Sequence, residues 1–203
     1  MTNSNPNNLG RIAATRRSAT EPLHHNGTPT EVSVRDFWEW SASDLVSNSQ
    51  RGVLAEYIVA LAVGGASGVR TEWDAVDVVA SDGTRIEVKS ASYIQAWKQS
   101  RLSPISFDIA PKQAWDAAAN TSTSVPVRSA DVYVFAILAH KDQATLDPLN
   151  LSQWEFYVLG AAVLDREVPV QKTISLGALE GLHPHRCDFS FIPTAVKLAS
   201  ETQ

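Results

Sequence analysis

The stretch AVDVVASDGTRIEVKS, residues 75–90, decides the fold. Apolar and polar residues alternate on both sides of Ser81-Asp82-Gly83, a pattern that predicts a β-hairpin. A two-residue turn would pair Asp77 with Val88, whereas a three-residue loop pairs Asp77 with Glu87. Glycine in the third place favours the longer loop, because that place takes the left-handed conformation of a β-bulge. The sequence therefore predicts that Asp77 stands opposite Glu87.

In this register two carboxylates and an amine share one face of the hairpin. The Cβ atoms of Asp77 and Glu87 are expected roughly 5 Å apart, with Lys89 two residues farther along the same face. The other face carries apolar side chains, namely Val76, Val78, Ile86 and Val88. Opposed carboxylates repel each other, and hard divalent ions such as Mg²⁺ prefer carboxylate oxygens. The pattern indicates a metal site, and the alternative is a surface hairpin whose outer face is merely charged.

The segment VLAEYIVALAV, residues 53–63, contains a single charged residue, Glu56. A helix begun by Ser49 as its N-cap and stopped by the glycine pair that follows fits this segment. A helix that is apolar on all sides is largely buried, and a buried carboxylate must be paired or bind a metal. We therefore expect Glu56 to point towards the hairpin. An ion pair with an arginine such as Arg51 or Arg85 is the alternative.

The rest of the chain predicts further strands and helices. Asp131–Ala139 is a near-continuous apolar run, as expected of a strand buried on both faces. Further elements are expected as strands at Val69–Trp73, Ile105–Ile109 and Trp154–Val163, and as helices at Ser92–Ser100, Lys112–Ala119 and after Ser175. This order describes an α/β sandwich around a mixed central sheet. The polar residues 1–30 are expected to be a disordered tail, and residues 31–203 a single domain.

Composition limits the partners and the location of the protein. Its 203 residues carry a net charge of −5, which argues against a protein that coats nucleic acid non-specifically. The stretch from Arg85 to Arg101 is nonetheless basic, and other basic residues that could extend it are Arg51, Arg70, Lys112 and Arg128. No apolar run approaches the ~20 residues that span a bilayer. The lone Cys187 excludes an intrachain disulfide, so a cytoplasmic protein without membrane contact is the expectation.

A helix glutamate, then Asp77, nine residues and Glu87-Val88-Lys89 in a hairpin resembles the PD-(D/E)xK nuclease superfamily. Restriction endonucleases and Holliday-junction resolvases belong to it. The resemblance covers residues 49–100 and implies a restriction-endonuclease-like α-β-β-β-α-β core, with a mixed central sheet flanked by helices. It also implies hydrolysis of DNA phosphodiester bonds with Mg²⁺, for which Mn²⁺ is a possible substitute. Val76 stands where the family has proline, and Asp74 is a competing aspartate on the opposite face.

The resemblance further implies a role for each site residue. Asp77, Glu87 and Glu56 become metal ligands, with Glu56 supporting the metal or its water. Lys89 becomes the catalytic lysine, and Gln95 matches a glutamine that some members carry on the helix after the lysine strand. The expected nucleic-acid contacts are the basic residues Lys98, Arg101 and Arg85.

Together these residues predict a metal-dependent DNA endonuclease that acts in restriction, defence or repair. Two alternatives stay open: a nucleic-acid-binding subunit that has lost catalysis on the same fold, or a nuclease acting on RNA or branched DNA. A homodimer or a partner specificity subunit is left open as well, since no separate DNA-reading module is evident in the sequence.

Overall fold

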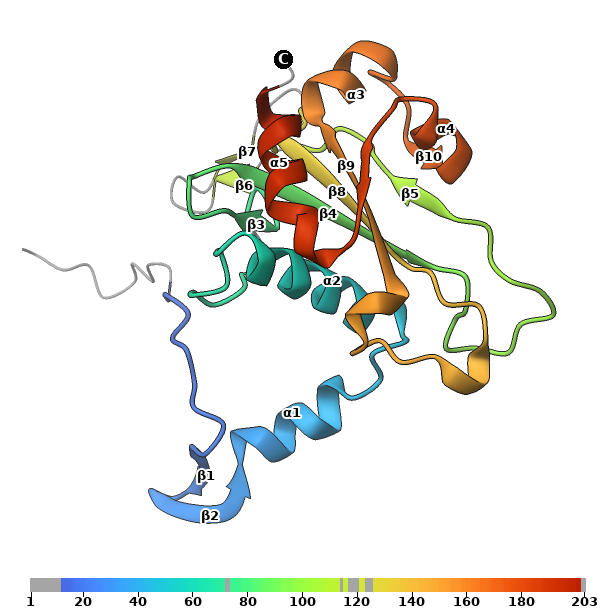
Figure 1. Cartoon of the computed structure of the whole chain (residues 1–203). Coiled ribbons are helices and arrows are strands. Elements are labelled where there is room, and N and C mark those ends of the chain that lie inside the picture. The colour runs from blue at the N-terminus through green and yellow to red at the C-terminus, as the bar shows by residue number, and fades with distance from the viewer. Residues whose placement is uncertain (1–11, 72–73, 114, 117–120, 123–125, 202–203) are drawn as a thin grey trace, which may run out of the picture.

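A mixed five-stranded sheet forms the centre of the protein (Figure 1). The computed structural model describes residues 12–71, 74–113, 115–116, 121–122 and 126–201. In spatial order the strands are β11 (His185–Cys187), β9 (Trp154–Gly160), β8 (Val132–Leu138), β4 (Arg85–Ser92) and β3 (Val78–Val79). Strands β4 and β8 run parallel, and the other neighbouring pairs are antiparallel. The predicted α/β class with a mixed sheet is therefore confirmed.

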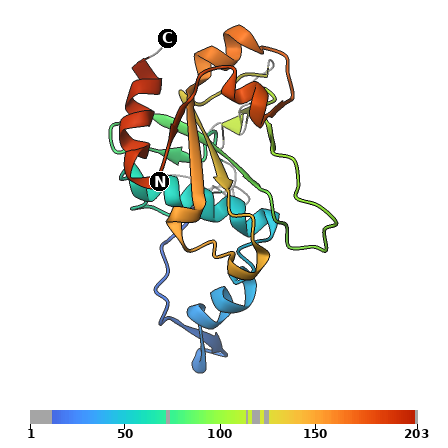
Figure 2. The ribbon, with the colours of Figure 1, turned by 45° about the vertical axis from the view of Figure 1, so that its right-hand side comes forward.

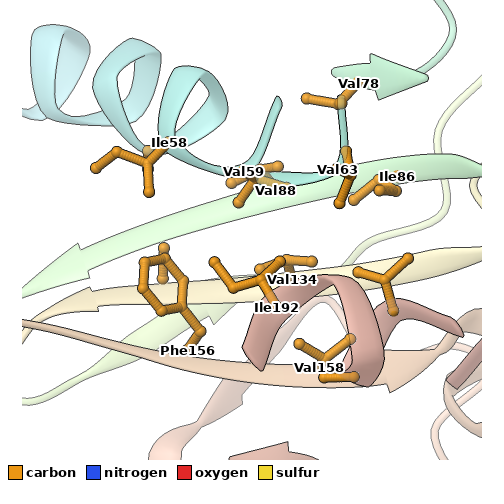
Figure 3. Close-up of a cluster of buried hydrophobic side chains, with 14 of the residues drawn as sticks. Ile58, Val59, Val63, Val78, Ile86, Val88, Val134, Phe156, Val158 and Ile192 are labelled. Carbon is orange, nitrogen blue, oxygen red and sulfur yellow. The ribbon is translucent and has the colours of Figure 1, made fainter. Parts of the chain in front are cut away.

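Every residue of β8 is buried, because both faces of the sheet are covered. One face packs against α2 (Asn48–Ala62) and α5 (Ile192–Glu201), and Figure 3 shows Val88, Val134 and Phe156 meeting these helices. The opposite face packs against α3 (Ala161–Glu167), α4 (Leu176–Glu180) and the two-stranded pair of β5 (Ser106–Asp108) and β10 (Thr173–Ser175). The remaining short elements are β6 (Trp115–Asp116), β7 (Thr121–Ser122), η1 (Gln143–Thr145), η2 (Leu151–Gln153) and η3 (Phe189–Phe191).

The hairpin of β3 and β4 has the predicted register. Val78 pairs with Ile86 and Val79 with Arg85. The loop is closed by hydrogen bonds from the Ala80 amide to the Thr84 carbonyl and from the Gly83 amide to the Ala80 carbonyl, both 2.9 Å. Gly83 has φ +92°, the left-handed conformation that the three-residue loop requires. Asp77 directly precedes β3 and lies outside the paired residues.

Helix α2 also lies close to its predicted position. It begins at Asn48 after the N-cap Ser47, two residues before the expected cap, and ends at Ala62. Gly64, with φ +71°, follows the helix end. Ala55, Ile58 and Val59 are buried against the sheet, whereas Tyr57 and Leu61 are half exposed. The apolar segment is therefore helical as predicted, but it buries one face and not its whole surface.

Four secondary-structure predictions were wrong in whole or in part. The described residues 69–71 form no strand, and Trp115–Asp116 form β6 where a helix was expected. The strand predicted to Val163 ends at Gly160, after which Ala161 begins α3. The helix predicted at Ser92–Ser100 is absent, and bends and turns stand there instead. The Gln99 side chain accepts from the Gln95 amide at 2.7 Å and donates to the Tyr93 carbonyl at 3.2 Å. Such side-chain bonds to the backbone replace those of a helix.

The N-terminal arm, residues 18–42, contradicts the prediction of disorder up to residue 30. It consists of β1 (Pro22–His25), β2 (Thr28–Ser33) and α1 (Val34–Ala42). Asn26 and Gly27 both have positive φ, which is the two-residue turn that the Asn-Gly pair favours. Helix α1 buries none of its residues, and the arm extends away from the sheet in both views (Figures 1 and 2). Among the described residues, both apolar cores contain only positions from Leu54 onwards.

Among the described helices, none combines the length and the hydropathy that crossing a bilayer requires.

Candidate active site

The predicted site lies where β3 stops beside β4. Among the described residues, no strand pairs with β4 beyond Ile86 on the side away from β8. The Asp77 side chain continues the ladder by one step, since its Oδ2 accepts a hydrogen bond from the Val88 amide at 2.8 Å. The carboxylate of Asp77 is thereby held against the backbone of the strand that carries Glu87 and Lys89.

Glu87 and Lys89 lie on the same face of β4, as predicted. Through the β4–β8 register they stand beside Tyr133 and Phe135, while Val88 lies on the opposite face in the core under α2. Lys89 Nζ donates to Glu87 Oε1 at 2.6 Å, and the two side chains are only 15% and 13% exposed. A partly shielded ion pair of this kind is stronger than a surface pair.

The apolar face of the hairpin differs from the prediction at one residue. Val76 packs with the core beneath α3 and α4, whereas Val78 belongs to the core under α2. The chain bends through residues 74–77, so strict alternation ends before Val78. Asp74, the competing aspartate, is exposed.

A second lysine reaches Glu87 from a distant part of the chain. Lys112 Nζ donates to the same oxygen, Glu87 Oε1, at 3.3 Å. Burial lowers the pKa of Lys112, but the attraction of Glu87 outweighs it and the pKa lies above its ordinary value. One carboxylate oxygen is therefore shared by the amines of Lys89 and Lys112.

The electrostatics of Asp77 show that the carboxylates repel. Burial, followed by the negative charge of Glu87, raises the pKa of Asp77 from 3.8 to about 6. The hydrogen bond from the Val88 amide and the charge of Lys89 act in the opposite direction, and Glu56 adds to the increase. A shared cation would remove this repulsion.

Glu56 forms an ion pair with an arginine from the segment that follows α2. Arg70 donates to its two oxygens at 2.5 and 3.1 Å, and the Glu56 side chain is 15% exposed. The alternative, an ion pair between Glu56 and an arginine, is therefore confirmed, although the partner is Arg70 and not Arg51 or Arg85. The negative charge of Glu56 makes a smaller contribution to the raised pKa of Asp77.

The three predicted metal ligands are not gathered into one cluster. Within the described ranges, no group of three or more histidine, cysteine, aspartate or glutamate side chains is arranged to hold a metal ion. Glu56 therefore stands apart from a pair formed by Asp77 and Glu87. Two carboxylates still suit a hard divalent ion, because Mg²⁺ keeps several waters and binds through one or two carboxylates. The donor chemistry of Asp77 and Glu87 fits such an ion.

The sequence of the whole region also matches a known family. A protein-family model described as bacteriophage T4 endonuclease IV matches residues 30–177. The chain belongs to this family. The matched range contains Glu56, Asp77, Glu87, Lys89 and Lys112, so the site lies inside the part that this endonuclease family shares. No curated protein matches the chain.

In this member of the endonuclease IV family, Gln95 does not lie on a helix. It follows β4 in a loop, where its Nε2 donates to the Ser92 carbonyl at 2.8 Å and its Oε1 accepts from Arg51 at 3.3 Å. The predicted helical glutamine is thus a loop residue, since the helix itself is absent. Gln95 contacts Arg51 and not the two carboxylates.

The three predicted nucleic-acid contacts do not form one patch. Arg85 begins β4 and pairs with Asp131 at 2.6 Å, whereas Lys98 and Arg101 follow the other end of the strand and are exposed. An eight-residue strand separates these positions by roughly 25 Å. The basic stretch from Arg85 to Arg101 is therefore divided between two ends of the sheet.

Sequence reasoning missed the partners that come from far along the chain. Lys112 and Arg70 appeared only as general basic residues, yet each contacts a carboxylate of the site region. A signal did exist, because partly buried carboxylates at Glu56 and Glu87 require cations nearby. The local pattern does not say which cations.

Proposed function

We propose that the chain is a metal-dependent endonuclease of the PD-(D/E)xK type that hydrolyses DNA phosphodiester bonds. The observation that carries the proposal is that the Val88 amide holds the Asp77 carboxylate against β4, next to Glu87, with Lys89 paired to Glu87 on the same face of the strand. The raised pKa of Asp77 supports it, because a protein gains nothing in stability from two repelling, partly buried carboxylates. Membership of an endonuclease family supports the same chemistry.

Asp77 and Glu87 would hold Mg²⁺, with Mn²⁺ as a substitute. When bound, such an ion lowers the pKa of a coordinated water and neutralises charge that develops on the phosphate. Asp77 must be ionised to act as a ligand, and its pKa of about 6 means that a proton competes for it in mildly acidic solution. The Val88 amide holds Asp77 Oδ2 in place and so reduces the rearrangement that binding requires.

Lys89 and Lys112 supply positive charge beside the carboxylate pair. Both amines donate to Glu87 Oε1, so an arriving phosphate competes with this oxygen for them. Lys89 is the more shielded amine and has the shorter contact with Glu87. We assign to Lys89 the stabilisation of the negative charge that develops on the reacting phosphate, and to Lys112 the attraction of the strand to the site.

Purified protein incubated with supercoiled, linear and branched DNA and with RNA, in Mg²⁺, Mn²⁺ or EDTA, tests this proposal. We expect cleavage of DNA in either metal and none in EDTA. Asp77→Asn, Glu87→Gln and Lys89→Met should each reduce the rate by about 100-fold or more. Glu167→Gln and Lys172→Met change exposed residues of the same types and should keep the rate of the unaltered protein.

Four results would contradict the proposal. Unreduced cleavage by Glu87→Gln would exclude the carboxylate pair as the site. Cleavage in EDTA would exclude the requirement for metal. Binding without cleavage of any substrate would favour the non-catalytic subunit, and cleavage of RNA alone would change the substrate class.

A further inference from the structure

A groove adjoins the C-terminal half of β4, beyond the residues of the carboxylate pair. It has a volume of about 400 Å³ and opens to solvent. Its lining includes Arg51, Ser90, Ser92, Gln95 and Trp97. Ser90 and Ser92 follow Lys89 by one and three residues, which is about 3 to 10 Å along a strand. By strand alternation Ser90 and Ser92 share the α2 face of β4 with Val88, whereas Glu87 and Lys89 lie on the opposite face. The groove therefore adjoins the carboxylate site along the strand and does not share its face.

Arg51 brings a buried positive charge to this groove. The residue is 4% exposed, and its guanidinium donates to the Val46 carbonyl at 3.0 Å and the Asn48 side chain at 2.8 Å. It also contacts the Ser90 hydroxyl and the Gln95 side chain, each at 3.3 Å. All these acceptors are neutral, and within the described part of the chain no carboxylate pairs with Arg51.

A buried charge without a counter-charge is costly, so the arrangement favours an anion in the groove. The surrounding amide and hydroxyl groups hold the guanidinium in position but do not neutralise it. Arg51 lies near the N-terminus of the fifteen-residue helix α2, whose dipole adds to the positive potential there. The guanidinium fork matches the oxygens of a phosphate group.

Trp97 adds a second, independent feature to the groove. It is 56% exposed, in contrast to Trp154, which is 2% exposed in the core. An aromatic ring left in water beside a cavity offers a flat surface on which a nucleobase can stack. The buried arginine and the exposed ring together match the phosphate and the base of a nucleotide.

We propose that this groove binds one nucleotide of the strand that is cut, with its phosphate held by Arg51 and its base stacked on Trp97. The inference rests on the proposed nuclease function and extends it. Gln95 and Asn48 border the same space and offer amide groups to the base or sugar. The groove is a binding subsite beside the carboxylate pair, and Arg51 and Trp97 position the strand without touching the reacting atoms.

Binding of a short fluorescent single-stranded DNA oligonucleotide in EDTA tests the stacking partner, with anisotropy as the readout. We expect Trp97→Ala to weaken binding about tenfold and Trp97→Phe to keep most of the affinity, since phenylalanine retains an aromatic face. Trp40→Ala is the matched control, because Trp40 is 86% exposed on the N-terminal arm. Equal affinities for Trp97→Ala and the unaltered protein would overturn the base contact.

The same titration over a range of salt concentrations tests the phosphate contact. Removal of one phosphate contact should reduce the slope of log affinity against log salt by about 1. Arg51→Met should show this reduction, whereas Arg51→Lys keeps the charge and should restore the slope. Arg166→Met, at an exposed arginine paired with Glu167, is the control. An unchanged slope in Arg51→Met would overturn the phosphate contact. If both Arg51 variants fail to fold, the binding of the Trp97 variants decides whether the groove holds a nucleotide.

Two further arms separate the possible sources of failure. In the first, inorganic phosphate is added as a competitor. If phosphate displaces the oligonucleotide while Trp97→Ala binds it as tightly as the unaltered protein does, the groove is a simple anion site and the nucleotide assignment is overturned. In the second, cleavage in Mg²⁺ is measured on the same proteins. Intact cleavage with no effect of Trp97 or Arg51 on binding rejects the groove alone. Absent cleavage with both binding effects present rejects the nuclease and retains the groove.

Discussion

Two β-hairpins in the described part of the chain are closed by glycine-containing turns, and they differ in what lies beneath them. The β1–β2 hairpin turns at Asn26-Gly27, and its strands are exposed along almost their whole length. The β3–β4 hairpin turns at Gly83, and Ile86 and Val88 of β4 are buried in the core under α2. Local turn chemistry thus forms both hairpins, but only the second is anchored by buried apolar side chains.

This difference explains why the charged site lies on β3–β4. Asp77 and Glu87 repel each other, and their separation would increase if the register could slip. Burial of the apolar face prevents slippage, because a shift of one residue would move Val88 into solvent and a charge into the core. A hairpin without a buried face, such as β1–β2, has no comparable means of holding like charges together.

The largest effect is expected from removing the same apolar group in both hairpins. Val88→Ala should lower the free energy of unfolding by about 2 to 3 kcal/mol, because Val88 is 7% exposed and its removal leaves a cavity. Val32→Ala in β2 should change it by less than about 0.5 kcal/mol, since Val32 is 48% exposed. Urea denaturation of both variants measures the difference. Similar losses in the two variants would mean that the arm unfolds together with the body.

A smaller effect is expected from the burial of Asp77 beside the charge of Glu87. The folded-state pKa of Asp77 is about 6, above its ordinary 3.8, so the folded protein binds this proton more tightly than the unfolded chain does. The free energy of unfolding should therefore fall as pH rises from about 4 to about 6 and show no further fall from this group above that. Asp77→Asn should remove this decrease in the free energy of unfolding between pH 4 and 6. In EDTA at pH 8 the same variant should have a free energy of unfolding about 2 kcal/mol higher than the unaltered protein.

Asp82, in the loop of the same hairpin, provides the control for the pH dependence. Its pKa lies below the ordinary value because the Thr84 backbone and side chain donate hydrogen bonds to it. Its stabilising contribution is present above pH 4 and decreases as pH falls, which is the opposite sign to Asp77. Asp82→Asn should therefore keep the decrease in stability between pH 4 and 6. A pH profile of Asp77→Asn identical to that of the unaltered protein would contradict the raised pKa of Asp77.

The smallest effect is expected from the glycines of the two turns. Gly27 and Gly83 have φ of +78° and +92°, and an added Cβ would meet no atom within 4 Å at either position. Alanine is therefore strained only by the backbone conformation, at a cost of about 1 kcal/mol. Thermal unfolding should show this loss for Gly83→Ala and no shift of the main transition for Gly27→Ala. A shift of equal size for both would show that the two hairpins are one cooperative unit.

Much of the site hairpin could be predicted because its determinants are local. The loop length follows from the position of Gly83, and the alternation of apolar residues follows from the strand period of two. These two features predict the hairpin register without any long-range information. The arm was missed although Asn26-Gly27 is an equally local signal, because the polar composition around it was given more weight.

The segments after β4 were predicted less well, because propensity alone does not count competing hydrogen bonds. Gln99 bonds to the backbone at Gln95 and Tyr93, and no helix forms where one was expected. As a result Gln95 lies in the groove beside Arg51. Its role there depends on Arg51 and Trp97, which no spacing in the sequence connects with it.

The amino-acid sequence by itself determined the hairpin register, the helix that carries Glu56 and the fully buried strand β8, because turn chemistry and periodicity act between near neighbours. Only the tertiary structure decided that Lys112 reaches Glu87, that Arg70 holds Glu56 and that Arg51 is buried beside a groove. Those contacts join residues far apart in the chain. They depend on how helices and strands pack around the sheet, and charge alone does not specify which basic residue meets which carboxylate.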